Sequence, residues 1–294
     1  MKEILELRLN NDFAHLLVDG DEGRKLGTSF RLVEISTDDP TYAKIPILRE
    51  QLKKEHDEAL FFGWEIKRKY TKAEFDTAKL FRVIVKSAFG PTGEECGTQY
   101  DDSVSCMICG ANRKQIGVLN LKPNSIANKD IARTIGGEVV VSELFFSNFE
   151  KWNLTGLEFG TVHQKDDIST YKQLIPLELL DLSDLTVAGI DPFDLSTSSE
   201  GTEFVVSDHY HVKLGSEIYR CPKGHTIGLN LLSEAYVLSK DSIGKYDFFR
   251  STQFLGVKRG LLNPEPLYFC SPSFRKMVLE TKLRGFEFEV VNLI

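Results

Sequence analysis

Hydrophobic and polar positions change period several times along the first ninety residues. Residues 1–35 carry alternating apolar side chains between turns, as in strands, whereas residues 45–60 show helical spacing with many charges. A capping-box spacing at residues 71–74 predicts a short helix, and the apolar, β-branched stretch 80–85 predicts a buried strand. We therefore expect an N-terminal α/β region over residues 1–93.

Two later segments repeat one pattern at a constant offset of 129 residues, without a gap. The identical pairs are Ser142/Ser271, Phe145/Phe274, Leu154/Leu283, Gly156/Gly285, Glu158/Glu287, Phe159/Phe288 and Val162/Val291. With shifted offsets the match continues upstream, where residues 130–133 (Asp-Ile-Ala-Arg) pair with residues 247–250 (Asp-Phe-Phe-Arg). We infer a degenerate internal repeat.

Each copy has the pattern of a strand, a helix and a second strand. Ser142 and Ser271 follow apolar strands and stand where an N-cap accepts hydrogen bonds from free helix N–H groups. Pro272 fits the first helical turn, and Gly156 and Gly285 stand where left-handed C-caps are expected. The predicted fold class is therefore α+β (mixed α/β), with two degenerate strand-helix-strand repeat units and the N-terminal α/β region.

The repeats divide the rest of the chain. The first repeat unit spans residues 94–165, a connecting segment without a clear repeat spans 166–218, and the second repeat unit spans 219–294. Residues 195–201 are the best candidate for a loop or hinge. The second copy carries an insertion of about twelve residues around 257–264, which fits a longer hairpin.

Charge and cysteine number restrict the environment and the partners. The 294 residues carry a net charge of −7, so the basic face of a general nucleic-acid binder is not indicated. The sequence has no run of eighteen apolar residues that would predict a membrane span, and its N-terminus lacks the apolar core of a signal peptide. We expect a cytoplasmic protein with reduced thiols, in which five cysteines favour metal binding or burial over disulfides.

A C-x-x-C-G turn at Cys106, Cys109 and Gly110 heads the first repeat unit. Two thiolates at this spacing can bind one face of a tetrahedral ion, and the glycine lets the backbone turn beneath the sulfurs. A redox C-x-x-C is one alternative, but it usually opens a helix after a strand, whereas residues 112–114 resemble a hairpin tip. Unliganded thiols are the other alternative.

The second repeat unit begins with a matching turn at residues 221–225 (Cys-Pro-Lys-Gly-His), in which glycine replaces the second cysteine and histidine follows. A structural zinc ion takes four protein ligands. We therefore predict a structural zinc site formed by Cys106, Cys109, Cys221 and His225, with Cys96 as the alternative to His225. Such a closed site would contribute to folding rather than to Lewis-acid chemistry.

The remaining candidate groups favour structural roles. Cys270 occupies a strand position that matches Val141 and is expected in the core. Residues 208–211 (Asp-His-Tyr-His) fit an exposed strand better than a metal site, and the repeated Glu158 and Glu287 fit solvent-facing strand positions better than an acid/base pair. A small phosphate-binding basic patch would comprise Lys258, Arg259, Arg275 and Lys276. No phosphate loop, nucleophile elbow or H-E-x-x-H motif occurs, so we predict no catalytic residues and no enzyme.

Together these motifs resemble the bacterial double-CXXCG immunity proteins of polymorphic toxin systems. The resemblance rests on the zinc-knuckle turn, the D-x-x-R segment and the strand, Ser-capped helix, L-x-G and strand that follow, over roughly residues 94–163 and 219–293. The first motif is complete, whereas the second keeps Cys221 and has Gly224 in place of cysteine. Residues 94–100 also resemble the E-E-C-G-T-x-Y segment of uncharacterised bacterial proteins.

The resemblance implies a non-catalytic, cytoplasmic immunity protein that neutralises a cognate bacterial toxin by direct binding. Such a protein needs a rigid scaffold and a complementary surface, and the acidic charge agrees with this role. A zinc-ribbon-type nucleic-acid-binding or regulatory protein is the alternative, which predicts a basic face. A third hypothesis, an enzyme assembled from distant residues, predicts a deep pocket with convergent polar groups.

Overall fold

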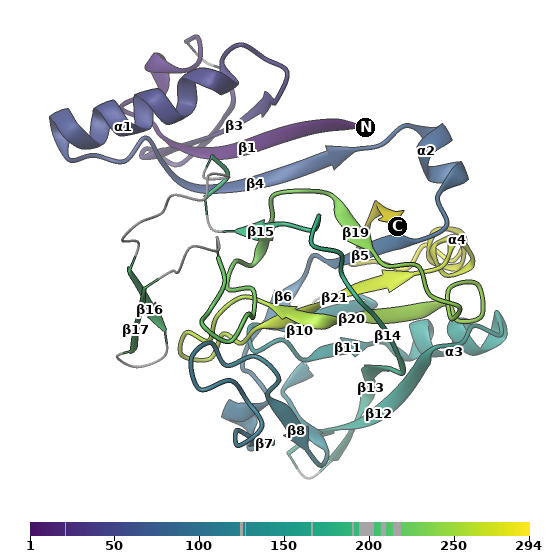
Figure 1. Cartoon of the computed structure of the whole chain (residues 1–294). Helices are drawn as coiled ribbons and strands as arrows, with labels where there is room; N and C mark the ends of the chain where they lie inside the picture. The colour runs from purple at the N-terminus through teal and green to yellow at the C-terminus, as the bar shows by residue number, and fades with distance from the viewer. Residues whose placement is uncertain are drawn as a thin grey trace. The chain divides into compact units, whose positions relative to one another are not determined.

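The computed structural model divides the chain into two compact units (Figure 1). The first consists of Met1–Asp76 with Asp191–Leu195, and the second of Thr77–Ile190 with Ser196–Ile294. The structure describes residues 1–20, 22–123, 126, 128–165, 167–189, 191–193, 203–206, 210–213 and 219–294. The loop expected at 195–201 and the side chains of residues 208–211 lie outside the described residues.

The first unit is a four-stranded antiparallel sheet with one long helix packed on it. Its strands are β1 (Lys2–Asn10), β2 (Arg24–Leu26), β3 (Phe30–Ser36) and β4 (Phe61–Lys69), in the order β2-β3-β1-β4, and its short 3-10 turns are η1 (Ala14–Leu16) and η2 (Tyr42–Lys44). Leu5, Leu7 and Leu9 of β1 are fully buried because alternate strand residues share one face. Helix α1 (Ile45–His56) covers that face with Ile45 and Leu52.

Helix α2 (Lys72–Thr77) follows the first sheet and begins as the sequence predicts. The Glu74 carboxylate accepts a hydrogen bond of 2.6 Å from the Thr71 N–H, while the Thr71 hydroxyl accepts one of 3.3 Å from the Glu74 N–H. This reciprocal pair confirms the expected capping box. None of the described helices has the length and apolar content needed to span a bilayer.

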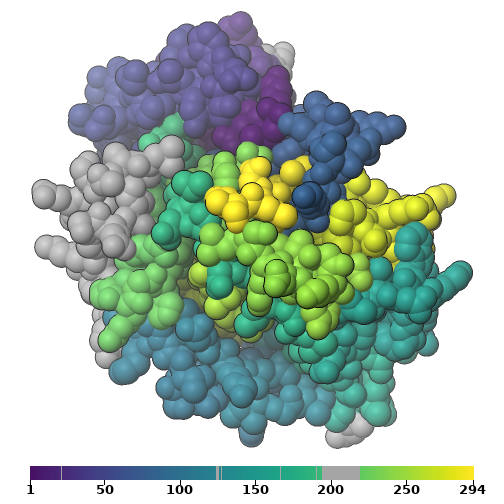
Figure 2. Space-filling view, turned by 45° about the vertical axis from the view of Figure 1, so that its right-hand side comes forward, coloured from purple at the N-terminus to yellow at the C-terminus, as the bar shows by residue number. Residues whose placement is uncertain are grey.

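The second unit contains two six-stranded sheets and three small ladders. The first sheet has the order β6 (Ala88–Phe89), β10 (Ile131–Thr134), β11 (Val139–Val141), β13 (Asp167–Pro176), β12 (Leu157–Gln164) and β9 (Leu119–Asn120). The second has the order β14 (Glu178–Leu180), β20 (Phe248–Leu255), β21 (Glu265–Cys270), β5 (Phe81–Val85), β22 (Phe286–Leu293) and β19 (Ala235–Val237). The ladders pair β7 (Gln99–Asp101) with β8 (Lys114–Ile116), β15 (Ala188–Gly189) with β18 (Asn230–Leu231), and β16 (Glu203–Val206) with β17 (Tyr210–Lys213). Figure 2 shows the C-terminal end of β22 in yellow beside the green segment that carries its parallel partner β19.

The predicted α+β fold class is wrong, because the protein is mostly β, with 41 % of residues in strands and 17 % in helices. The helices of the second unit, α3 (Glu143–Lys151) and α4 (Pro272–Glu280), are only nine residues long. Each sheet also contains strands of two or three residues, which are too short to give a period-2 signal in the sequence. The strand-helix-strand segments are therefore parts of larger sheets rather than units of their own.

The two sheets have equivalent strands in the same order, and each takes its central strand from the opposite part of the chain. We call residues 81–164, which carry β5 to β12, the N-half, and residues 167–293, which carry β13 to β22, the C-half. In corresponding order the sheets are β6-β10-β11-β13-β12-β9 and β14-β20-β21-β5-β22-β19, and every pairing has the same direction in both. Strand β5 of the N-half thus lies in the sheet of the C-half, and β13 of the C-half lies in the sheet of the N-half.

Two aspartates connect the halves reciprocally. Asp130 of the N-half accepts a hydrogen bond from the Arg284 N–H at 2.7 Å, and Asp247 of the C-half accepts one from the Thr155 N–H at 2.9 Å. In return, the Asp130 N–H donates to the Arg284 carbonyl and the Asp247 N–H donates to the Thr155 carbonyl. Carboxylates that accept backbone N–H groups form the stronger class of hydrogen bonds, so these contacts fix the halves together.

The same aspartates orient the helix caps. The Ser142 hydroxyl donates to Asp130 at 2.9 Å and the Ser271 hydroxyl donates to Asp247 at 2.6 Å. Each serine oxygen then accepts a backbone N–H three residues further on, at 3.2 Å in α3 and 3.1 Å in α4. The two predicted N-caps are confirmed.

Gly156 and Gly285 allow the halves to approach closely, and they do not end the helices. Helices α3 and α4 end four or more residues earlier, so the predicted C-cap positions are wrong. A Cβ atom at Gly156 would lie 2.5 Å from the Phe248 carbonyl oxygen, and one at Gly285 would lie 2.5 Å from the Ile131 carbonyl oxygen. Both glycines also have positive φ, +97° and +106°, which larger residues rarely adopt.

Aromatic side chains fill the space between the helices, which lie at the same end of the second unit (Figure 1). Phe145 of α3 and Phe274 of α4 occupy equivalent positions, are fully buried and have ring centroids 5.9 Å apart. Phe286 of β22 stacks on Phe145 at 5.8 Å. Buried aromatic groups at these distances contribute both area and favourable ring geometry.

We expect Asp130→Ala to lower the free energy of unfolding of the second unit by about 3 kcal/mol, because it leaves the Arg284 N–H and the Ser142 hydroxyl, both partly buried, without their acceptor. Urea unfolding should be followed by Trp152 fluorescence in a Trp64→Phe background, since these are the two tryptophans and only Trp152 belongs to the second unit. Asp241→Ala, in an exposed turn, is the matched control and should change stability by less than about 0.5 kcal/mol. Equal unfolding midpoints for both variants would contradict a stabilising role of Asp130.

Candidate metal centre

The C-x-x-C-G segment forms a tight turn in the N-half. The Gly110 N–H donates to the Cys106 carbonyl at 2.7 Å, and the Cys106 N–H donates to the Ala111 carbonyl at 2.8 Å. Gly110 has a φ of +78°, and a Cβ atom there would lie 2.7 Å from the Lys258 Cβ. Glycine is therefore required both by the backbone conformation and by the close approach of the 257–264 insertion.

The second knuckle, residues 221–225 of the C-half, is a similar hydrogen-bonded turn that is one residue shorter. The Gly224 N–H donates to the Cys221 carbonyl at 2.8 Å, the Cys221 N–H donates to the His225 carbonyl at 2.9 Å, and Gly224 has a φ of +81°. The Lys223 N–H donates to the Cys221 sulfur at 3.4 Å. The turn thus keeps the form of a knuckle although its second cysteine is absent.

The two turns bring Cys106, Cys109, Cys221 and His225 together. One ligand atom from each lies within 4.8 Å of all the others, which is close enough to hold a metal ion. The His225 Nδ1 atom lies 3.5 Å from the Cys109 sulfur and 3.6 Å from the Cys221 sulfur. Its Nε2 atom lies 3.4 Å from the Asn112 Nδ2 atom, so the Asn112 side chain packs beside the ring.

The thiols of the first knuckle differ in acidity. Burial alone would raise the pKa of Cys106, but hydrogen bonds from the Cys109 and Ile108 N–H groups outweigh it and lower the pKa below its ordinary value. Burial raises the pKa of Cys109 strongly, and the neighbouring thiol groups add to the increase. A cation at the cluster would reverse this penalty, because metal ligation deprotonates thiols outright.

The other candidates of the sequence lie elsewhere. Cys96 ends the 3-10 turn η3 (Glu94–Cys96) and is not part of the cluster of described ligand atoms. Cys270 is fully buried in β21, as expected. Glu158 and Glu287 are exposed, and Glu287 pairs with Lys86 at 2.7 Å, which agrees with solvent-facing strand positions.

The residues considered for a phosphate-binding basic patch have separate contacts. The Arg275 guanidinium lies over the Phe81 ring at 5.1 Å, and Lys276 pairs with Glu280 at 3.8 Å. Lys258 lies in the insertion, and its backbone N–H donates to the Cys109 carbonyl at 2.9 Å. Its position therefore supports the first knuckle.

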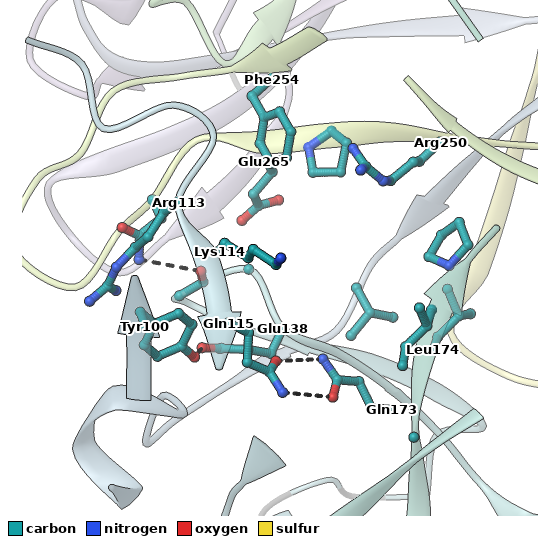
Figure 3. Close-up of a pocket in the computed structure, with 18 of the residues that line it drawn as sticks. Tyr100, Arg113, Lys114, Gln115, Glu138, Gln173, Leu174, Arg250, Phe254 and Glu265 are labelled. Atoms are coloured by element: carbon teal, nitrogen blue, oxygen red, sulfur yellow. Dashed lines mark hydrogen bonds between the residues drawn. The ribbon is translucent and has the colours of Figure 1, made fainter. Parts of the chain in front are cut away.

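Beside the cluster lies a pocket of about 870 Å³ that the sequence analysis missed (Figure 3). Its walls come from the β7–β8 ladder, from β12 and β13, and from the turns of the β10–β11 and β20–β21 hairpins. Asn112 lines this pocket and also contacts His225. The segment after the first knuckle is thus shared by the cluster and the pocket.

Two pairs of polar side chains in the pocket, Gln115 with Gln173 and Tyr100 with Glu138, bind each other. Gln115 and Gln173 exchange two hydrogen bonds, of 2.6 and 3.1 Å. Glu138 accepts hydrogen bonds from the Tyr100 and Thr134 hydroxyls, and burial together with the Glu138 charge raises the pKa of Tyr100. These pairs account for the polar contacts drawn at the lower wall in Figure 3.

No protein-family model matches the chain, and no curated protein matches it either.

Cys106 should react with iodoacetamide faster than Cys96 in metal-free protein near neutral pH. Both thiols are partly exposed, but the pKa of Cys106 is lowered whereas burial raises that of Cys96, and the thiolate is the reactive form. Mass spectrometry of tryptic peptides after brief alkylation measures the ratio. The advantage of Cys106 should shrink as the pH rises above the ordinary thiol range, because both thiols then ionise. Equal rates at neutral pH would contradict the inferred difference in pKa.

Proposed function

We propose that the chain is a non-catalytic binding protein whose second unit is stabilised by a structural zinc ion. The observation that carries the proposal is the convergence of Cys106, Cys109, Cys221 and His225. Three thiolates and one imidazole favour zinc over hard cations such as calcium or magnesium, and four protein ligands fill a tetrahedral shell. No position is left for a reacting water, so the ion would serve folding rather than chemistry.

The proposed ion would connect the two halves. Cys106 and Cys109 belong to the N-half, whereas Cys221 and His225 belong to the C-half. Cys109 and Cys221 are buried, and burial raises the pKa of Cys109, so a cation bound by the four ligands would favour the thiolate forms. In zinc-finger peptides such ligation contributes an apparent free energy of about 10–16 kcal/mol. The second unit should therefore depend on its metal for stability.

We further propose that this protein is an immunity protein that neutralises a cognate bacterial toxin by direct binding. The resemblance of its knuckle, D-x-x-R and Ser-capped segments to double-CXXCG immunity proteins supports this proposal. Stoichiometric inhibitors generally act through preformed surfaces that move little on binding. The exchange of central strands and a metal ion bound by both halves would make the second unit rigid. The net charge of −7 favours a basic partner.

Purified protein is expected to contain about one zinc ion per chain, measured by inductively coupled plasma mass spectrometry. Cys106→Ser and His225→Gln should each lose most of the metal, because either change opens the tetrahedral site. Cys96→Ser is the matched control, since it removes a thiol outside the cluster, and it should retain the metal. Protein purified without chelators that holds no metal would refute the zinc proposal, and zinc loss in Cys96→Ser alone would favour Cys96 as the fourth ligand.

The immunity proposal predicts that co-expression rescues growth of cells that produce the toxin encoded beside this gene. A stable complex should co-purify, because neutralisation occurs by direct binding. An unrelated toxin and the metal-site variant Cys106→Ser are the controls, and neither combination should restore growth. Failure of the intact protein to bind or neutralise the neighbouring toxin would remove the proposal, and salt-dependent binding of DNA or RNA would instead favour a nucleic-acid regulator.

A further inference from the structure

One cation of the pocket, Arg250, has no carboxylate partner among the described residues. Arg250 belongs to β20 and is half-buried, and its guanidinium donates to the Ser251 carbonyl at 3.3 Å and lies over the Phe254 ring at 5.4 Å. Burial of its guanidinium group in the pocket wall lowers its pKa, because the charge is partly removed from water. A desolvated cation without an anion is costly, so its position needs an explanation.

The internal duplication supplies a comparison within the same molecule. Arg133 is the third residue of β10, and Arg250 is the third residue of the equivalent strand β20. Across their hairpins Arg133 pairs with Val139 and Arg250 pairs with Tyr268. Val139 and Tyr268 are themselves 129 residues apart, so the two arginines are equivalent. Arg133 forms an ion pair with Glu265 at 2.7 Å. At the offset of 129 residues, the position equivalent to Glu265 is Gly136.

Arg250 therefore lacks the ion pair that Arg133 forms, because glycine stands at the position equivalent to Glu265. Gly136 lines the same pocket as Arg250 but has no side chain to offer. The two carboxylates that do line the pocket are already bound, Glu265 by Arg133 and Glu138 by Tyr100 and Thr134. The arrangement leaves one arginine facing a cavity in the place where its counterpart has a carboxylate.

A second cation faces the same space. Lys114 of β8 lines the pocket and points into it from the wall opposite Arg250 (Figure 3). Its neighbour across the β7–β8 ladder is Asp101, which lies outside the pocket lining. Leu174 and Phe254 add apolar surface to the pocket. Pockets of this size are typical of small-molecule sites with few polar groups that fix orientation.

We propose that this pocket binds a small organic anion, whose carboxylate or phosphate group pairs with Arg250 and Lys114 and whose apolar body packs on Phe254 and Leu174. The anion would take the place that Glu265 takes beside Arg133. Arginine suits this role because its planar fork can donate two parallel hydrogen bonds to a carboxylate or phosphate. The site is distinct from the metal cluster and does not depend on the proposed immunity function.

Phenyl phosphate and benzoate are suitable probes, because they share an aromatic body and differ in the anion. Isothermal titration at constant ionic strength should detect binding of at least one of them to the intact protein, and the stronger probe identifies the preferred anion. Present at ten times its Kd, that probe should raise the thermal midpoint by roughly 3 °C. Arg250→Gln should weaken its binding roughly 10- to 100-fold, as expected for loss of a charge-assisted hydrogen bond.

Controls separate a binding role from a structural one. Arg8→Gln, at an exposed arginine of β1, removes the same charge and should leave the affinity unchanged. Without probe, Arg250→Gln should unfold at the same or a higher temperature than the parent protein, because the change removes a partly desolvated cation. If Arg250→Gln does not fold, the affinity for the probe is measured with Lys114→Gln and Arg250→Lys instead, and both changes should weaken binding. Absence of binding by either probe at 10 mM, or equal affinity in the pocket variants and the parent, would overturn the proposal.

Discussion

The exchange of central strands constrains the whole second unit. Strand β5 forms ladders with β21 and β22, and β13 forms ladders with β11 and β12. Removing either strand would leave a sheet split at its centre, with unpaired backbone groups along two edges. Neither half can therefore complete its sheet alone. The reciprocal contacts of Asp130 and Asp247, and the glycine approaches beside them, are consequences of this intertwining, because they occur where the halves are forced together.

The two halves have diverged where they carry candidate chemistry. The second knuckle keeps Cys221 and offers His225, while the first keeps both cysteines, so one ligand cluster results rather than two. The second hairpin carries the insertion that supports the first knuckle through Lys258. The first hairpin has Gly136 where the second has Glu265, which leaves Arg250 without the partner of Arg133. Framework residues of the duplication are preserved in both copies, whereas the cluster and the pocket depend on differences between them.

The sequence predicted local features better than it predicted topology. The capping box at Thr71 and the N-caps at Ser142 and Ser271 follow from short-range spacing, which a sequence displays directly. The clustering of the four proposed ligands was predicted from two short motifs and from the repeat that relates them. The fold class was wrong because β6 and β9 have two residues each, and because β5 and β13 pair with strands of the opposite half. The pocket was missed because the repeated D-x-x-R segment marks Arg133 and Arg250 as equivalent but does not reveal that, among the described residues, only Arg133 pairs with a carboxylate.

Strand exchange also has a consequence for the order in which the protein can fold. Arg82 of β5 and Glu289 of β22, which form an ion pair at 2.8 Å, are 207 positions apart in the chain. At ordinary rates of translation, β5 would leave the ribosome roughly 10–40 s before its partner β22. During that time an apolar strand with two free edges is exposed to other nascent chains. Such long-range pairing slows folding, so the stability of the intertwined sheets comes with a late and vulnerable final step of assembly.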